Sequence, residues 1–75
     1  MMLSKVLRES FNVEENQYSD ESLLMNFKEW DSMAHMFFIT KLEEMYGIEI
    51  TGDEIADMKS IGDVKQVILK RGLNI

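Results

Sequence analysis

The longest helical pattern of apolar and polar residues runs from Glu29 to Gly47 in this 75-residue chain. Asp31 can cap the first exposed amides and Gly47 suits a left-handed exit, so we predict one helix of about four turns. At about 100° per residue, its apolar side chains fall on two separate arcs. One arc should face the core and contains Phe38, Ile39, Leu42, Met45 and Tyr46.

The second arc of this helix mixes apolar, polar and charged side chains. It contains Met33, Met36, Phe37, Thr40, Glu43 and Glu44, with Ser32 in the first turn at its head. Carboxylates without partners are almost never fully buried, so this arc should face water. A partner-binding surface and incidental surface apolar residues both fit this pattern, because scattered exposed apolar side chains are common.

A first helix and a long loop are predicted before the central helix. The first helix spans residues 3–11, its apolar positions recur at helical spacing, and Asn12 can form its exit. Residues 12–30 carry no sustained period, and such long connections are uncommon in compact domains unless they are functional. A short turn is expected at residues 19–22, and the loop should be held to the core by Leu23, Leu24 and Phe27.

Two further helices are predicted after the central one. Residues 47–51 alternate apolar and polar side chains, but a single short run cannot make a sheet, so we expect an extended connector with inward isoleucines. Capping boxes at residues 51–54 and 60–63 begin a short third helix and a last helix that ends at Gly72. The expected fold is an all-α four-helix bundle of three longer helices and a short one, with a long loop between helices 1 and 2, in a single domain over residues 1–75.

Composition and charge exclude several kinds of function. The chain has no cysteine and one histidine, so no thiolate or multi-histidine metal site is possible. Fourteen acidic residues against eight basic ones give a net charge of −6, which repels nucleic acid and can steer basic partners. No apolar run approaches the ~20 residues of a membrane span, and the N-terminus lacks a signal-peptide pattern. We therefore expect a cytoplasmic monomer that binds neither nucleic acid nor membrane.

The pair Asp31-Ser32 at the start of the central helix is the candidate site. A phosphoryl group on the Ser32 hydroxyl would meet free backbone amides and the positive end of the helix dipole. Most Asp-Ser pairs are ordinary helix starts, so the pair alone does not establish a site. Asp31, Ser32 and His35 could also be considered as a hydrolytic triad, because Ser32 and His35 are one helical turn apart. Such a triad would further need an oxyanion hole and a substrate cleft, so we expect no catalysis. His35 should instead be packed or hydrogen-bonded to the loop.

Several motifs together resemble the acyl carrier protein family. Trp30-Asp31-Ser32-Met33 is followed by Leu42-Glu43-Glu44 and then by Ile48-Glu49-Ile50, similar to the Asp-Ser-Leu, Leu-Glu-Glu and Ile-x-Ile steps of that family. The first-helix pattern and the start of the last helix, Ser60-Ile61-Gly62-Asp63-Val64, also fit. The resemblance covers nearly the whole chain.

The resemblance implies a non-catalytic carrier. Ser32 would take a 4′-phosphopantetheine arm from coenzyme A and carry acyl intermediates as thioesters, for lipid, fatty-acid or polyketide-type biosynthesis. Asp31 would match the acid beside the attachment serine. The implied partners are a phosphopantetheinyl transferase and acyl-activating and acyl-transferring enzymes with basic docking patches. Recognition positions of the family match Met33, Glu43 and Glu44, and the rest of the outward arc would line the same surface.

Departures from the family pattern favour a specialised carrier over housekeeping fatty-acid synthesis. Phe37 stands where many fatty-acid carriers place an acidic residue, and Trp30 replaces a small residue. An aminoacyl or peptidyl carrier with the same arm and an unmodified helical interaction module are the alternatives. The methionines expected near the bundle either fill the core or line a pocket that opens for an acyl chain: Met25, Met36, Met45 and Met58.

Overall fold

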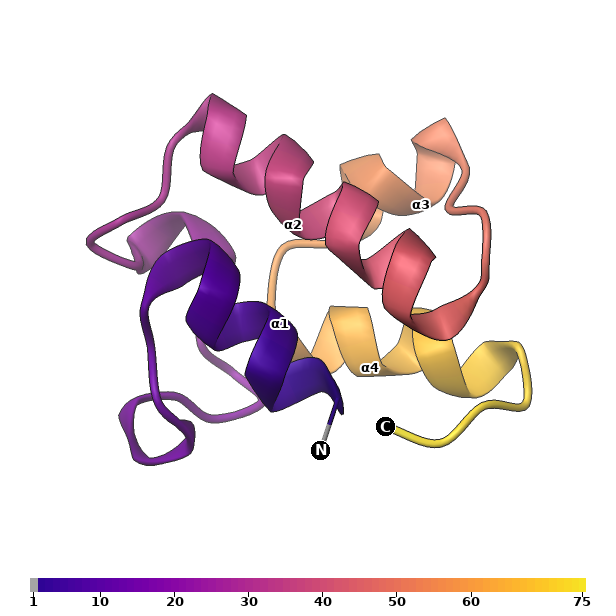
Figure 1. Cartoon of the computed structure of the whole chain (residues 1–75), viewed down its shortest axis with the longest axis horizontal. Coiled ribbons are helices and arrows are strands. Elements are labelled where there is room, and N and C mark those ends of the chain that lie inside the picture. Colours follow the sequence, from indigo (N-terminus) through magenta and orange to yellow (C-terminus); the bar gives the residue numbers. More distant parts are fainter. Residues whose placement is uncertain (1) are drawn as a thin grey trace.

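The fold is an assembly of helices in a computed structural model that describes residues 2–75. In chain order, the elements are α1 (Met2–Phe11), η1 (Glu15–Gln17), η2 (Leu24–Asn26), α2 (Ser32–Tyr46), α3 (Gly52–Asp57) and α4 (Ile61–Lys70), where η denotes a 3-10 helix (Figure 1). No strand is present between residues 2 and 75, where the only β-type pairing is an isolated antiparallel bridge between Leu23 and Ser60. The predicted all-α bundle of three longer helices and a short one is confirmed.

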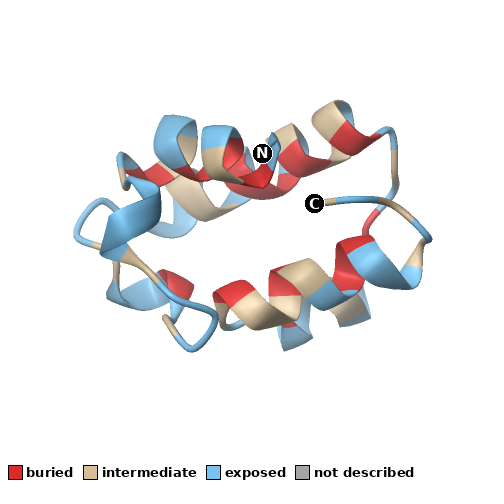
Figure 2. Ribbon diagram, turned by 90° about the horizontal axis from the view of Figure 1, so that it is seen from below, coloured by how far each residue is buried: buried red, intermediate tan, exposed pale blue. Residues whose placement is uncertain are grey.

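The core lies between helices whose buried faces are turned toward one another (Figure 2). α1 and α2 pack against each other, and α4 closes the core with its own apolar stripe. Among the described residues, no polar or charged residue is buried. The three longer helices supply most of the core: Leu3, Val6, Leu7 and Phe11 from α1, Phe38, Ile39, Leu42 and Tyr46 from α2, and Ile61, Val64, Val67 and Ile68 from α4.

The helix boundaries follow from local capping chemistry. The Asp31 side chain accepts a hydrogen bond from the Ala34 amide at the start of α2, and Gly47 ends the helix in the left-handed region with φ of 65°. Thr51 and Ser60 form the predicted capping boxes of α3 and α4. Asn12 leaves α1 with φ of 55°, a conformation that asparagine tolerates better than most residues. These predicted ends are confirmed.

The loop between α1 and α2 is held by both side chains and backbone. Leu24 is buried, and the Phe27 ring packs 5.5 Å from the ring of Phe11. The Leu24 amide donates to the Lys59 carbonyl at 2.9 Å, and the Ile61 amide donates to the Ser22 carbonyl at 3.0 Å. These bonds join the loop to the connector between α3 and α4.

Two expectations for this part of the chain need correction. Leu23 is 39% exposed instead of buried, because its backbone bridges to Ser60 and turns its side chain away from the core. Of the methionines expected near the bundle, Met58 is buried and Met45 packs against the core, but Met25 and Met36 are 64% and 53% exposed. Those two methionines are therefore surface residues.

The short helix α3 is tied to α4 by charge. The Arg71 guanidinium donates to both carboxylate oxygens of Glu54, at 2.9 and 2.6 Å, and also to the Glu49 carbonyl. Lys70 lies 3.3 Å from the same carboxylate. The hydrogen bond from Arg71, followed by those from Thr51 and Lys70, holds the pKa of Glu54 well below its usual value. Since α3 has no fully buried residue of its own, these bonds hold it on the bundle.

Candidate functional site

The candidate site begins at the first residue of α2. Ser32 is exposed there, directly after the equally exposed cap Asp31. The Asp31 carboxylate accepts from the Ala34 amide at 2.7 Å, and its backbone carbonyl accepts from the His35 amide at 2.9 Å. The amides of Ser32 and Met33 come before that of His35, the first amide that donates to a carbonyl within the helix, so they can donate to an anion at the positive end of the helix dipole.

A second pair of side chains stands beside Ser32. The Trp30 indole Nε1–H donates to Nδ1 of His35 at 3.3 Å, and the two ring centroids lie 5.9 Å apart. Burial lowers the pKa of His35 from its ordinary value of 6.5, because the neutral ring is better tolerated away from water. His35 is thus bonded to the loop, as predicted.

The same bonds argue against a hydrolytic set at this position. In a catalytic triad, a carboxylate accepts from one ring nitrogen of the histidine and so orients the other toward the serine. Here Nδ1 of His35 is itself an acceptor, and the Asp31 carboxylate is bonded to a backbone amide. The His35 ring is therefore not oriented as a general base toward the Ser32 hydroxyl, and the Asp31 carboxylate does not orient the ring. The chemistry available at Ser32 is therefore that of an accessible hydroxyl on which another protein can act.

A small cavity opens next to this helix start. Its volume is about 190 Å³, and it reaches from η2 to α3 with Trp30 and His35 on the side of Ser32. The other lining residues come from separate segments of the chain: Leu24, Met25, Ile55, Ala56, Met58 and Lys59. Two of them, Met25 and Met58, belong to the methionines expected either to fill the core or to line a pocket, whereas Ala56 and Lys59 were not singled out from the sequence. The mostly apolar lining suits the apolar part of a molecule held near Ser32.

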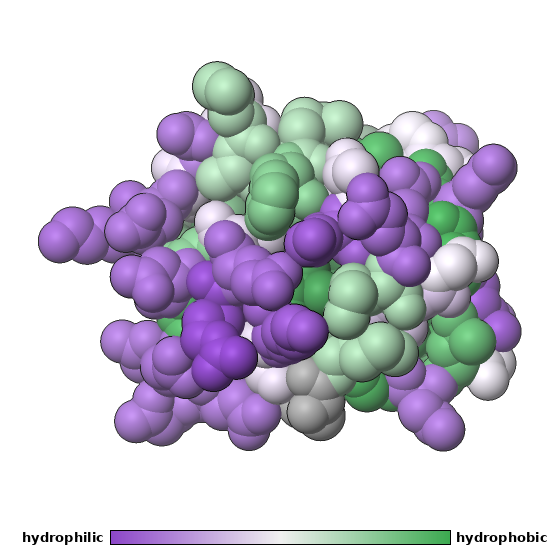
Figure 3. All heavy atoms as spheres, viewed as in Figure 1, coloured by the Kyte–Doolittle hydropathy of each residue, from purple (hydrophilic) through white to green (hydrophobic). Residues whose placement is uncertain are grey.

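The outward face of α2 begins beside Ser32 and is mainly apolar. Met33, Met36 and Phe37 are 83%, 53% and 48% exposed, and Figure 3 shows hydrophobic side chains gathered over this helix. Thr40 and Glu44 are also exposed on α2. The structure thus brings five of the six predicted partner-facing residues to the surface.

Glu43 differs from the rest of that set. It is half-buried, and its Oε2 accepts a hydrogen bond from the Ile50 amide at 2.9 Å. The carboxylate therefore supports the connector that leads from α2 to α3, and the expectation that Glu43 simply faces water is wrong. The helical spacing could not reveal this contact, because Ile50 lies beyond the end of the helix.

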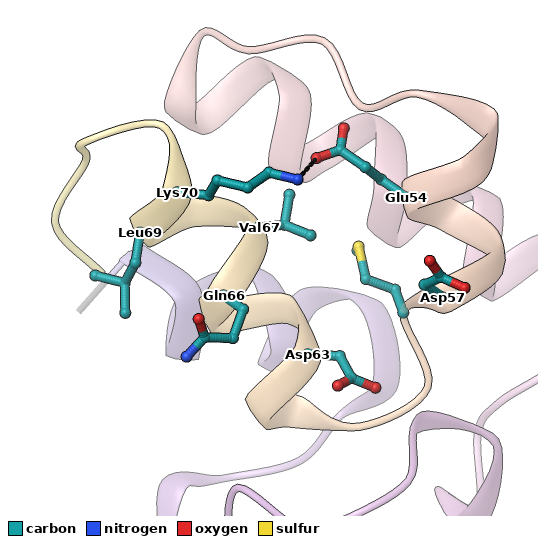
Figure 4. A pocket seen from close by; sticks show the side chains of 8 residues that line it. Glu54, Asp57, Asp63, Gln66, Val67, Leu69 and Lys70 are labelled. Carbon is teal, nitrogen blue, oxygen red and sulfur yellow. Dashed lines mark ion pairs between the residues drawn. The ribbon is translucent and has the colours of Figure 1, made fainter.

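A wider hollow of about 460 Å³ lies between α3 and α4 (Figure 4). Glu54, Asp57 and Asp63 line it together with Lys70, which forms an ion pair with Glu54. Asp63 caps α4 through the amides of Lys59 and Ser60. Two of the three carboxylates thus serve the fold. Among residues 2–75, no cluster of three or more histidine, aspartate or glutamate side chains is arranged to hold a metal ion.

Comparison with known proteins finds relatives that are acyl carrier proteins. No family model matches the chain. An acyl carrier protein of Lactobacillus acidophilus is 29% identical over 66 residues, which cover 88% of this chain and 82% of that protein. One from Coprothermobacter proteolyticus is 27% identical over 66 residues, covering 88% and 80%. The meromycolate extension acyl carrier protein of Mycolicibacterium aurum is 24% identical over 68 residues, covering 91% and 70%.

The chain is a helical bundle with an exposed serine, Ser32, at the start of its second long helix. Over most of its length the chain is similar to these acyl carrier proteins, and its all-helical fold agrees with that similarity. A carrier role follows in general terms from these relatives. Within residues 2–75, no helix combines the length and apolar character needed to cross a membrane.

Proposed function

We propose that this chain carries acyl intermediates as thioesters on a 4′-phosphopantetheine arm attached to Ser32. The observation that supports this most directly is an exposed hydroxyl at the first position of α2, in a chain similar to acyl carrier proteins over most of its length. Residues 1–75 would form one acyl carrier domain, working as a cytoplasmic monomer. Its partners would be a phosphopantetheinyl transferase and enzymes that load and unload acyl groups in lipid, fatty-acid or polyketide-type biosynthesis.

The residues around Ser32 fit such an attachment. When the arm is bound, it supplies the thiol that a chain without cysteine lacks. In the modification, the Ser32 oxygen forms a bond to phosphorus and gives up its proton, while adenosine 3′,5′-bisphosphate leaves from coenzyme A. The amides of the first turn and the helix dipole stabilise the negative charge of the resulting phosphodiester. Asp31 keeps the helix start fixed through its bond to the Ala34 amide.

The test is to incubate the protein with coenzyme A and a broad-specificity phosphopantetheinyl transferase and to measure its mass. We expect a gain of one phosphopantetheinyl group on the wild type and none on Ser32→Ala. Ser19→Ala is the matched control, since Ser19 is an exposed serine in the loop before η2, and it should be modified normally. The absence of a gain on the wild type, or an equal gain on Ser32→Ala, would refute the proposal and leave a helical interaction module.

A second measurement identifies the cargo class. The modified protein is offered to acyl-activating and to aminoacyl-activating enzymes, and the thioester is detected by mass. We expect loading with acyl groups. Loading with amino acids alone would instead make the chain an aminoacyl or peptidyl carrier.

A further inference from the structure

Three exposed side chains on α2 form a continuous surface that we call the apolar ridge: Met33, Met36 and Phe37. They are three and four positions apart, so they are neighbours on one face of the helix. Their exposed fractions are 83%, 53% and 48%, and Figure 3 shows hydrophobic side chains collected over this part of the molecule. All three lie within five residues of Ser32 in the sequence, and Met33 directly follows it.

The helix α2 contributes little to the net negative charge of the chain. Between residues 32 and 46, Glu43 and Glu44 stand against Lys41, a net charge of −1 (two acidic, one basic), whereas the whole chain carries −6. The surplus of acidic residues therefore lies on other elements. A basic patch on a partner would find little uncompensated negative charge on this helix.

The few charged groups of this helix also have partners within the chain. The Glu43 carboxylate accepts from the Ile50 amide at 2.9 Å. Glu44 lies 3.9 Å from the Lys41 ammonium, which is also 4.0 Å from the Glu9 carboxylate. These carboxylates are already engaged, although the exposed ion pairs are weak. The ridge is the larger uncommitted feature of the surface.

Phe37 has a neighbour that helps to hold its ring in place. The Lys41 ammonium lies 5.9 Å from the centre of that ring, within the range of a cation–π contact. An aromatic side chain that is already oriented loses less conformational freedom when a partner covers it. Phe37 is therefore suited to act as an anchor, with the flexible methionines adapting around it.

We propose that the apolar ridge seats in an apolar groove of the transferase that modifies Ser32, so that this partner recognises the chain mainly through hydrophobic contact. The partner is defined by its action at Ser32, and the inference thus rests on the proposed function. An enzyme that covers Met33, Met36 and Phe37 has the Ser32 hydroxyl at the edge of its contact surface. For this partner, the apolar groove replaces the basic docking patch implied by the family resemblance.

The experiment measures kcat/KM for the modification of the full chain by a broad-specificity phosphopantetheinyl transferase with coenzyme A. Phe37→Gln and Met36→Gln/Phe37→Gln are compared with Leu69→Gln, because Leu69 on α4 is also 48% exposed. We expect kcat/KM to fall at least about tenfold in the ridge variants, mainly through KM, as for an anchor residue of an interface. Leu69→Gln should match the wild type. Raising the salt from low to high concentration should change kcat/KM less than about threefold, since hydrophobic contacts are not screened.

Each other outcome has a distinct meaning. Ridge variants modified as fast as the wild type would overturn the inference and leave the carrier function intact. A steep loss of rate with salt, or a larger effect of Glu44→Lys than of Phe37→Gln, would overturn it in favour of docking by charge. If the wild type were not modified at Ser32 at all, the proposed function would fail and the inference with it.

Two further measurements complete the test. All replaced side chains are exposed, so thermal unfolding of the variants should match the wild type, and this separates docking from misfolding. Sedimentation of the wild type should show a single monomeric species. A dimer that is lost in Phe37→Gln would assign the ridge to a second copy of the chain and overturn the inference.

Discussion

At the scale of single residues, Asp31 and Ser32 have separate roles at the start of α2. The Asp31 side chain bonds the Ala34 amide and sets the position at which the helix begins. Ser32 is then the first helical residue and is exposed. The local sequence is enough to produce this arrangement, because capping depends only on residues within one turn. The sequence predicted that His35 would be packed or bonded to the loop, but it could not show that Trp30 is the loop residue that donates to it.

The Trp30–His35 pair leads to a prediction about pH. Burial lowers the pKa of His35 below 6.5 in the folded protein, so the unfolded chain binds the proton more readily. The stability that comes from neutral His35 is therefore fully present above pH 6.5 and is lost as the pH falls through the folded pKa. Protonation also removes the acceptor of the Trp30 indole. We expect a tryptophan fluorescence titration with its midpoint below 6.5, and none in His35→Phe. A midpoint at or above 6.5 would contradict the burial of this ring.

At the scale of elements, the helix ends were predictable and the contacts between elements were not. Thr51 and Ser60 cap their helices with residues three positions away, and both were recognised in the sequence. Leu23 and Leu24 are adjacent, yet only Leu24 is buried, because the backbone of this segment pairs with the connector between α3 and α4. Short 3-10 turns such as η1 and η2 also carry no periodic signal. Such features depend on parts of the chain that are distant in sequence.

Glu43 and Glu44 are adjacent residues of α2 with different surroundings, and this predicts different consequences of mutation. Glu43 accepts from the Ile50 amide, whereas Glu44 has an exposed ion pair with Lys41. We expect Glu43→Ala to lower the free energy of unfolding by about 1–2 kcal/mol, since it leaves an amide without its charged acceptor. Glu44→Ala should change it by less than about 0.5 kcal/mol. Thermal unfolding followed by circular dichroism measures both. Equal effects would mean that the bond to Ile50 does not contribute to stability.

At the scale of the whole molecule, one small core supports both the fold and the site. The apolar positions that the helical period assigned to the core of α1 and α4 are buried, as are four of the five on α2. Periodicity identifies such positions because each longer helix has one face toward the same interior. It does not identify the cavity beside Ser32, whose lining comes from η2, α2 and α3 together. The core was thus largely predictable, and the surroundings of the serine were only partly so.

Replacing Leu42 tests how much the core contributes to the free energy of unfolding. Leu42 is 1% exposed and belongs to the buried cluster to which α1, α2 and α4 contribute. Leu42→Ala removes buried volume and should cost ~2–5 kcal/mol. A domain of this size has a total stability near the lower end of about 5–15 kcal/mol, so the variant should be largely unfolded at moderate temperature. Urea unfolding followed by circular dichroism gives the difference, with Leu69→Ala as the control because Leu69 is 48% exposed. Equal losses for the two variants would place Leu42 outside the core, and the orientation of α2, with the ridge and Ser32 facing outward, would then be wrong.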